Sequence, residues 1–326
     1  MRVGRARRSG VSPHEREFLL SETFLSLADA DDVFTVAAPD GAVLPVYELR
    51  GPGPALLFGH ANGLAAGSYA PWLKQLSLGA HVFAYDARGQ GGSLWPDGPL
   101  DQVFHTDRFA EDLALVAASV TARLGGVVPA YLGHSLGAAS ALDLAIMGKL
   151  PDFTAVMAIE PPIFPAPGSH ARAEAERIQD RLVAGAAKRR ADWPSPQAFY
   201  ERLKSSQSVF ARFADDMLLA QCRATLKPKP EGAGYTLCCP PAIECAVFEA
   251  HRRSDSWSKL SCIDRALDLV GGDPNRPDRD WVSTAMPEMA AQLKRARLTV
   301  LAGAGHLMIS EEPARLLALV RRWLGG

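Results

Sequence analysis

A serine stands at the centre of the pentapeptide Gly133-His134-Ser135-Leu136-Gly137. The apolar run at 127–132 has the length and composition of a buried strand, and an apolar segment with helical spacing follows the pentapeptide. A serine at such a strand-to-helix turn projects its hydroxyl away from the sheet, and the two glycines let the strand and the helix approach closely. The N–H of Leu136, in the first turn of the helix, has no intrahelical acceptor and can donate to an oxyanion. The pattern therefore predicts Ser135 as a nucleophile.

A serine hydroxyl becomes a good nucleophile only when a base takes its proton, and the base needs a third group to orient it. His306 follows the last predicted strand, at 298–303, and Asp273 follows the strand before it, at 266–270. The carboxyl ends of parallel strands face one crevice, so these side chains can converge on Ser135. The order of the three residues along the chain predicts a catalytic triad of Ser135, His306 and Asp273.

A second carboxylate competes with Asp273 for the role of the acid. Glu160 ends the predicted strand at 153–159, and its side chain is the longer of the two. Alternatively, Glu160 caps a backbone turn before Pro161-Pro162. We favour Asp273, because it lies in a tight turn that can aim its carboxylate at His306, and we place Asp278 and Asp280 well behind both.

Helical segments separate the predicted strands along most of the chain, so the sheet is expected to be mostly parallel, with helices on both faces. This is an α/β fold, preceded by a hairpin with Asp40-Gly41 as its turn. The alternation of strands and helices stops at about residue 163, where charged and alanine-rich helical segments begin. We therefore predict a core of residues 31–162 and 243–326, a helical cap at 163–242 and a flexible tail at 1–30.

The chain has 326 residues and a net charge of -1, which gives no reason to expect a nucleic acid or an anionic membrane as a partner. No apolar stretch is long enough to span a bilayer, and polar residues follow the basic start where a signal peptide would be apolar. We expect a cytoplasmic protein with a small-molecule substrate and no cofactor or metal. The cysteines include no Cys-x-x-Cys pair and are expected to be free thiols: Cys222, Cys238, Cys239, Cys245 and Cys262.

Taken together, these motifs make the sequence similar to the α/β-hydrolase superfamily across roughly residues 33–326. More narrowly, the chain resembles a bacterial subgroup with His-Ala-Asn-Gly in the oxyanion loop. The resemblance implies an oxyanion hole formed by the N–H groups of Leu136 and Asn62. It also implies that His60, Ala61 and His134 stand in the walls of the substrate-binding site. The matching stretches are His60-Ala61-Asn62-Gly63, 85–93, 133–137 and Gly305-His306-Leu307-Met308.

A serine nucleophile with a histidine base suits acyl transfer. We therefore expect a serine hydrolase that cleaves a carboxylic ester, or a thioester, of a small or medium organic acid through an acyl-enzyme. Two other functions remain open. One is hydrolysis of a carbon–carbon bond in a diketone by the same triad, and the other is non-catalytic binding by a protein of the same fold.

Overall fold

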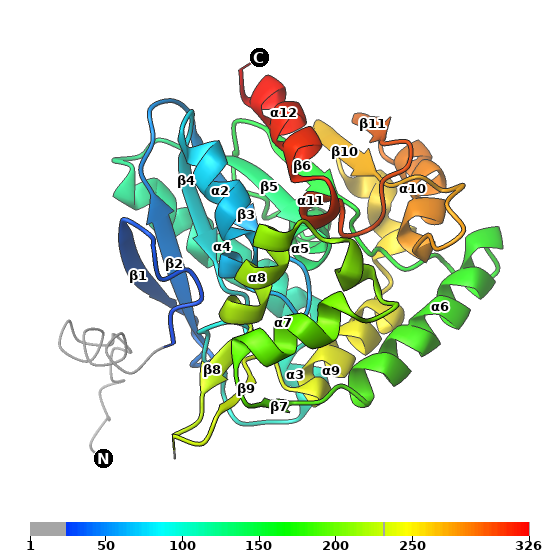
Figure 1. The fold of residues 1–326 in the computed structure, drawn as a ribbon. Coiled ribbons are helices and arrows are strands. Elements are labelled where there is room, and N and C mark those ends of the chain that lie inside the picture. The colour runs from blue at the N-terminus through cyan, green and yellow to red at the C-terminus, as the bar shows by residue number, and fades with distance from the viewer. Residues whose placement is uncertain (1–23, 231, 326) are drawn as a thin grey trace, which may run out of the picture.

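The computed structural model describes residues 24–230 and 232–325. At its centre lies an eight-stranded sheet with the strand order β1-β2-β4-β3-β5-β6-β10-β11 (Figure 1). The strands are β1 (Asp32–Ala37), β2 (Val43–Leu49), β3 (Ala55–Gly59), β4 (His81–Tyr85), β5 (Ala130–His134), β6 (Val156–Ile159), β10 (Leu267–Gly271) and β11 (Ala296–Val300). The hairpin strands β1 and β2 pair antiparallel, as do β2 and β4, whereas the other neighbouring strands are parallel. The predicted α/β fold with a mostly parallel sheet is confirmed.

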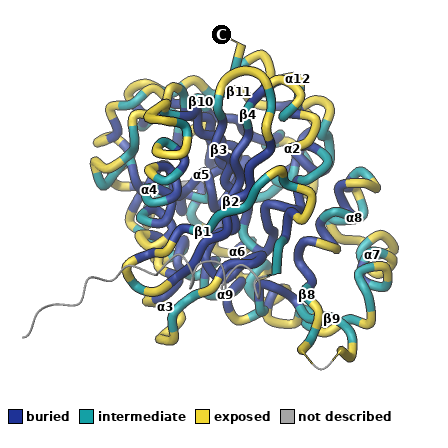
Figure 2. The backbone as a smooth tube through the Cα atoms, turned by 90° about the vertical axis from the view of Figure 1, so that its left-hand side faces the viewer, coloured by how far each residue is buried: buried dark blue, intermediate teal, exposed yellow. Residues whose placement is uncertain are grey.

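Each strand sends alternate side chains to the two faces of the sheet. In β3, Leu57 belongs to one buried apolar cluster, whereas Leu56 and Phe58 belong to the other. Helices α4, α5 and α10 cover the first cluster, and α2 and α12 cover the second. Figure 2 shows the buried strands between helices whose outer sides are exposed. The helices are α2 (Ala70–Ser77), α3 (Leu100–Val103), α4 (Thr106–Arg123), α5 (Leu136–Ile146), α10 (Trp281–Gln292), α11 (Met308–Glu311) and α12 (Pro313–Leu324), with 3-10 turns η1 (Ala66–Tyr69) and η3 (Ser256–Cys262).

The segment at 163–242 contains the predicted helices and a small sheet that the sequence did not indicate. It comprises α6 (His170–Ala187), α7 (Pro196–Lys204), η2 (Val209–Arg212), α8 (Asp215–Ala224) and the strands β7 (Asp192–Trp193), β8 (Leu226–Pro228) and β9 (Tyr235–Leu237), in the order β7-β9-β8. Strands of two or three residues are too short to show an alternating pattern. The segment has an apolar cluster of its own, which includes Phe199, Phe213 and Leu218. The next helix, α9 (Pro241–Arg253), packs against α6.

Part of the stretch predicted as an N-terminal tail packs onto the core. Residues 1–23 lie outside the described part of the chain. Within 24–30, Leu27 is buried in the second cluster, and the hydroxyl of Ser26 donates to Asp86 over 2.8 Å. Asp86 is also buried and follows β4, so this contact ties the beginning of the described chain to the sheet.

A buried ion pair connects the loop after β4 to helix α4. Both side chains are almost fully buried, and the guanidinium of Arg88 binds the Asp112 carboxylate through two hydrogen bonds of 2.7 Å. The remaining nitrogen of Arg88 donates to Asp40 and to the carbonyl of Val103, over 2.8 and 3.0 Å. Every charged end of this cluster therefore has a partner, which is the condition for burying charge at an acceptable cost.

Replacing Arg88 by methionine should lower the free energy of unfolding by about 3–5 kcal/mol, because the Asp112 carboxylate would remain buried without its partner. Urea denaturation followed by circular dichroism measures the change. Arg108→Met is the control, since the pair of Arg108 with Glu111 lies on the surface, and such pairs are worth about 1 kcal/mol or less. Equal losses in the two variants would contradict a special role for the buried pair.

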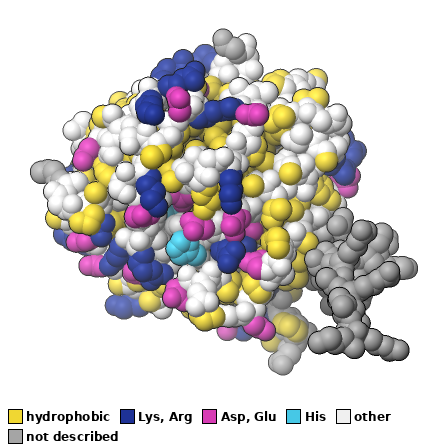
Figure 3. Space-filling model, turned by 180° about the vertical axis from the view of Figure 1, so that it is seen from behind, with side chains coloured by type: hydrophobic (Ala, Val, Ile, Leu, Met, Phe, Trp, Pro, Cys, Tyr) yellow, Lys and Arg dark blue, Asp and Glu magenta, His cyan; other side chains and the backbone are white. Residues whose placement is uncertain are grey.

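The surface carries charges of both signs. Figure 3 shows basic and acidic side chains interspersed with apolar ones on the face it presents, in keeping with the near-neutral net charge. Within residues 24–230 and 232–325, no helix combines the length and apolar character needed to cross a membrane. The same residues contain no cluster of three or more His, Cys, Asp or Glu side chains suited to a metal ion. All five cysteines are free thiols.

Candidate active site

Ser135 occupies the turn between β5 and α5 in a conformation that is rare for a residue with a side chain. Its φ is 51°, and its N–H donates to the carbonyl of Ile159, on the neighbouring strand β6, over 2.8 Å. A Cβ on Gly137 would lie 2.5 Å from the backbone of Gly59, and one on Gly133 would meet the backbone of α5 at the same distance. The two glycines of the pentapeptide are thus required for the close approach that holds this strained turn.

His306 links the serine to a carboxylate. Its Nε2 lies 3.0 Å from Ser135 Oγ, and its Nδ1 lies 3.1 Å from Glu160 Oε2. An ionised carboxylate can only accept hydrogen bonds, so Nδ1 carries the proton and Nε2 faces the serine hydroxyl as an acceptor. This chain of hydrogen bonds can pass the serine proton to His306 while Glu160 stabilises the imidazolium that forms.

Glu160 is held firmly at the end of β6. It is completely buried, and its φ of 49° turns the chain sharply after the strand. Its Oε1 accepts the N–H of Gly272 over 2.5 Å, and its Oε2 accepts the hydroxyl of Ser283 over 3.0 Å. These donors compensate the buried charge and leave the carboxylate aimed at His306.

The structure corrects the preference for Asp273. Its two carboxylate oxygens accept the N–H groups of Asn275 and Gly303, each over 2.8 Å, and no hydrogen bond joins it to His306. These backbone donors also lower the pKa of Asp273. Asp273 therefore fastens the loop after β10 to the loop after β11, which is the capping role that the sequence suggested for Glu160. The alternative acid, Glu160, takes the place beside His306.

Two backbone N–H groups point to an oxyanion hole. Those of Leu136 and Asn62 have no acceptor among the described residues, and Asn62 lines the same cavity as Ser135. The side chain of Asn62 is occupied, because it donates to the carbonyl of Glu244 and accepts from Gln90, over 3.2 and 3.3 Å. The side chain thus positions the Asn62 backbone, and the N–H remains free to meet a developing negative charge.

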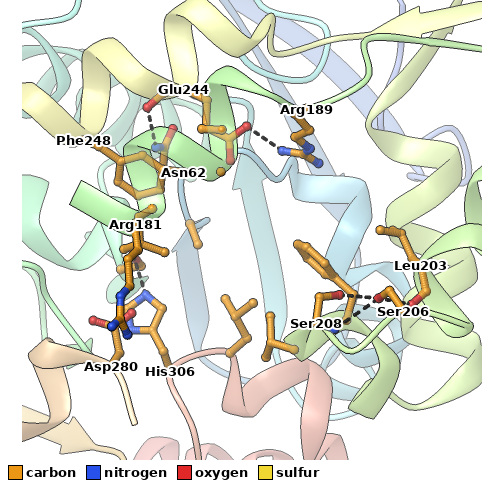
Figure 4. A pocket seen from close by; sticks show the side chains of 18 of the residues that line it. Asn62, Arg181, Arg189, Leu203, Ser206, Ser208, Glu244, Phe248, Asp280 and His306 are labelled. Atoms are coloured by element: carbon orange, nitrogen blue, oxygen red, sulfur yellow. Dashed lines mark hydrogen bonds and ion pairs between the residues drawn. The ribbon is translucent and has the colours of Figure 1, made fainter. Parts of the chain in front are cut away.

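A cavity of about 1060 Å³ opens above Ser135 and His306. The core contributes the loop with Ala61 and Asn62, helix α9 and the beginning of α10, whereas the segment at 163–242 contributes α6, α7 and η2. Figure 4 shows His306 and Asp280 at one end of the view and Leu203 at the opposite end. This volume suits a small organic molecule, which would reach the serine between the sheet edge and the inserted helices.

A sequence model described as "Alpha/beta hydrolase family" matches residues 56–319. The chain belongs to the α/β hydrolase family. The match includes the loop with His60, the pentapeptide around Ser135, the segment at 163–242 and His306. Comparison with curated proteins gives no match.

Solved structures of other α/β hydrolases share the fold. E-2-(acetamidomethylene)succinate hydrolase has a TM-score of 0.70 and 20% identity, over 90% of this chain and 100% of that one. The esterase RhEst1 from Rhodococcus sp. ECU1013 has a TM-score of 0.66 and 16% identity, over 90% and 98%. A thioesterase domain from the curacin biosynthetic pathway has a TM-score of 0.64 and 18% identity, over 89% and 99%. At these identities, the likeness concerns the fold alone.

The two histidines expected in the walls of the substrate site are bound within the protein instead. His60 accepts the N–H of Ala87 at Nε2 over 2.9 Å, and its Nδ1 lies 2.8 Å from the carbonyl of Ala61. His134 contacts the carbonyl of His306 through Nε2 over 2.8 Å and the hydroxyl of Tyr69 through Nδ1 over 2.7 Å. Both are buried and neither lines the cavity, whereas Ala61 does. In this α/β hydrolase they fix the loops that carry Ala61 and His306.

For the site of this α/β hydrolase, sequence reasoning missed Ser283 and ranked Asp280 only as a remote candidate for the acid. Ser283, in α10, binds Glu160, but a serine inside a helical segment gives no sign of its direction. Asp280 caps α10 by accepting the N–H of Val282 over 3.2 Å, and it lines the cavity beside His306. Its position before a helix can be read as a cap signal, but only the structure places it at the site.

The charges around His306 favour its protonated form. Burial opposes protonation, but the hydrogen bond to Glu160 and the negative charges of Asp280, Glu160 and Glu311 outweigh it and raise the pKa of His306. An ordinary histidine has a pKa of about 6.5, so the imidazole of this site loses its proton at a higher pH.

The rate should therefore fall with decreasing pH, since only the neutral imidazole can take the serine proton. Activity is present above the pKa of His306 and is lost as the pH falls through it. Asp280→Asn removes a negative charge and keeps the helix cap, because asparagine also caps. It should move the acid limb of the kcat/KM profile to lower pH, whereas Asp101→Asn, exposed on α3, should not. A profile that is flat from about pH 5 to 8 would contradict His306 as the base.

Proposed function

We propose that this α/β hydrolase is a serine hydrolase that cleaves a carboxylic ester, or a thioester, of a small or medium organic acid. The observation that carries the proposal is the hydrogen-bonded chain from Ser135 through His306 to Glu160. Family membership supports hydrolysis in general, and the serine nucleophile favours acyl transfer over displacement at saturated carbon. The cytoplasmic location stays a prediction from the sequence.

The reaction follows from the geometry in two halves. Ser135 Oγ attacks the carbonyl carbon of the substrate while its proton passes to His306 Nε2, and the Leu136 and Asn62 N–H groups stabilise the oxyanion. His306 then gives this proton to the departing alkoxide or thiolate, which leaves an acyl-enzyme. Water repeats the attack with His306 again as base, and the acid and free Ser135 are released. Glu160 keeps the imidazole in the required tautomer throughout.

We further propose that the segment at 163–242 acts as a cap that selects the substrate. Its helices α6 and α7 supply much of the wall of the cavity above Ser135. Most of the aromatic residues of the segment pack into its own apolar cluster, as Phe213 does. Two members of this cluster, Phe199 and Phe210, also line the cavity. A wall built by one inserted segment can change its side chains without disturbing the sheet that holds the triad.

A panel of p-nitrophenyl esters, acyl-CoA thioesters and vinylogous diketones tests the reaction type. We expect hydrolysis of esters or thioesters with a burst of the first product, as an acyl-enzyme requires when its hydrolysis is slow. Turnover of diketones alone would replace the proposal by carbon–carbon bond hydrolysis. Absence of turnover and of covalent labelling at Ser135 would favour a non-catalytic binding protein.

A further inference from the structure

The wall of the cavity carries an excess of positive charge. Seven lysine and arginine side chains line it, against three aspartate and glutamate side chains. The basic residues are Arg181, Lys188, Arg189, Arg190, Arg202, Arg212 and Arg279. A cavity in which one sign of charge dominates concentrates ligands of the opposite sign.

The three acidic residues of the wall are already engaged. Glu244 binds Arg189 over 2.6 Å, and Asp278 binds Arg212 over 2.8 Å. Asp280 caps α10 through the N–H of Val282. Glu244 and Asp278 are thus paired with cations of the wall, whereas Asp280 keeps its charge and forms no ion pair among the described residues. Among the described residues, four cations of the wall have no acidic partner: Arg181, Lys188, Arg190 and Arg202.

Unused hydrogen-bonding groups occur in the same wall. Arg189 Nη2 and His251 Nε2 are buried, belong to residues that line the cavity, and have no partner within the described chain. The whole of His251 is only 4% exposed, and burial lowers its pKa to about 4, so its imidazole is neutral at ordinary pH. A buried polar atom without a partner is costly, and a polar ligand in the cavity would satisfy it.

Among these unpaired cations, Arg181 lies on α6 and, in the view of Figure 4, at the same end as His306 and Asp280. Arg202 lies on α7, and the residue that follows it, Leu203, is drawn at the opposite end of that view. Both arginines are exposed and line the cavity, but different helices carry them.

We infer that the substrate is an anionic ester or thioester, with a carboxylate that Arg181 binds while the scissile carbonyl lies at Ser135. This inference rests on the proposed function, because it concerns the same site. An arginine binds a carboxylate through two parallel hydrogen bonds, which gives the substrate a defined orientation as well as affinity. Neutral esters of the same length lack this contact and should bind more weakly.

The preference for an anionic substrate can be tested with two pairs of esters. Within each pair, one ester carries a carboxylate and the other carries a neutral amide in its place. In one pair the acyl part varies: p-nitrophenyl hydrogen adipate against p-nitrophenyl 5-carbamoylpentanoate. In the other the leaving group varies: 4-acetoxybenzoate against 4-acetoxybenzamide. In at least one pair, kcat/KM should be about 10- to 100-fold higher for the acid, the range expected for a hydrogen bond to a charged group. The difference should lie mainly in KM and shrink as salt is added.

Arg181→Gln should remove this preference. Arg202→Gln removes the same charge from α7 instead of α6, and it should retain the preference. Equal kcat/KM for acid and amide in both pairs would overturn the inference. A preference that survives Arg181→Gln would also overturn it. So would a preference that Arg202→Gln removes equally, because the positive charge of the whole cavity wall, and not Arg181, would then select the anion.

Binding to the Ser135→Ala variant separates this inference from the proposed reaction. Calorimetry compares monomethyl adipate with methyl 5-carbamoylpentanoate, and 4-acetoxybenzoate with 4-acetoxybenzamide. In at least one pair the Kd of the acid should be about 10- to 100-fold below that of the amide, and Arg181→Gln in the same background should abolish the difference. Equal affinities in both pairs would overturn the inference while ester hydrolysis by the parent enzyme still stood. A clear preference for the acid without turnover of any ester would instead refute the proposed function.

Discussion

Replacing Ser135 by alanine should lower turnover about a million-fold, as removal of a triad serine does in other serine hydrolases. Without Oγ no acyl-enzyme can form, while the oxyanion hole and the cavity remain. The variant should keep its fold, because alanine is smaller and the Ser135 N–H bond to Ile159 is a backbone contact. Initial rates with the best ester of the panel, normalised to protein with a parental circular dichroism spectrum, measure the loss.

Ser140→Ala provides a matched control for this result. Ser140 is also buried, lies in α5 and donates its hydroxyl to the carbonyl of Leu136 over 2.8 Å. It does not line the cavity, so its loss should leave turnover near the parental value. A folded Ser135→Ala variant with more than about a tenth of the parental activity would remove Ser135 as the nucleophile, since triad serines contribute far more.

Glu160→Gln should lower turnover about ten-thousand-fold, because the glutamine cannot hold the imidazole tautomer or support the imidazolium. The substitution keeps the volume of the side chain and an oxygen that can accept from Gly272. Asp273→Asn is the matched control, since it changes the competing carboxylate in the same way. Its turnover should stay near the parental value, because Asp273 contacts the backbone of Asn275 and Gly303 and not His306.

Both variants should be assayed side by side, with folding checked by circular dichroism and thermal unfolding. Near-parental turnover of Glu160→Gln beside an inactive but folded Asp273→Asn would show that the acid is Asp273 after all. A loss in both variants with intact folding would mean that the two carboxylates act together, and the single-acid account would be wrong.

The sheet and two members of the candidate triad could be predicted because their signals are local. Buried strands appear as short apolar runs in the sequence. Ser135 follows one such run directly, and His306 follows the turn after another. The glycines of the pentapeptide are equally local, because only a residue without a side chain allows the contact between Gly137 and Gly59. Sequence patterns thus located the sheet edge and the two groups that we propose to exchange the proton.

The acid could not be predicted because two carboxylates follow strand ends at the same edge. The choice depends on the direction in which each side chain points, and the local sequence does not encode that direction. Glu160 has a φ of 49° and binds Gly272 and Ser283, which lie in distant parts of the chain. Asp273 turns instead to the N–H of Gly303, on the far side of α10 in sequence. The cavity could not be predicted for a similar reason. The charged pattern of α6 does not indicate which face of this helix lies over Ser135.

The most direct test of the account is covalent labelling of the parental protein with a fluorophosphonate, followed by peptide mass spectrometry. Trypsin should release residues 124–149, which contain both Ser135 and Ser140. We expect a single adduct that fragmentation assigns to Ser135, and none in Ser135→Ala. Among the described residues, Ser135 is the serine whose hydroxyl lies within hydrogen-bond distance of His306. An unlabelled folded protein, or an adduct on Ser140 or on another peptide, would contradict Ser135 as the nucleophile of this hydrolase.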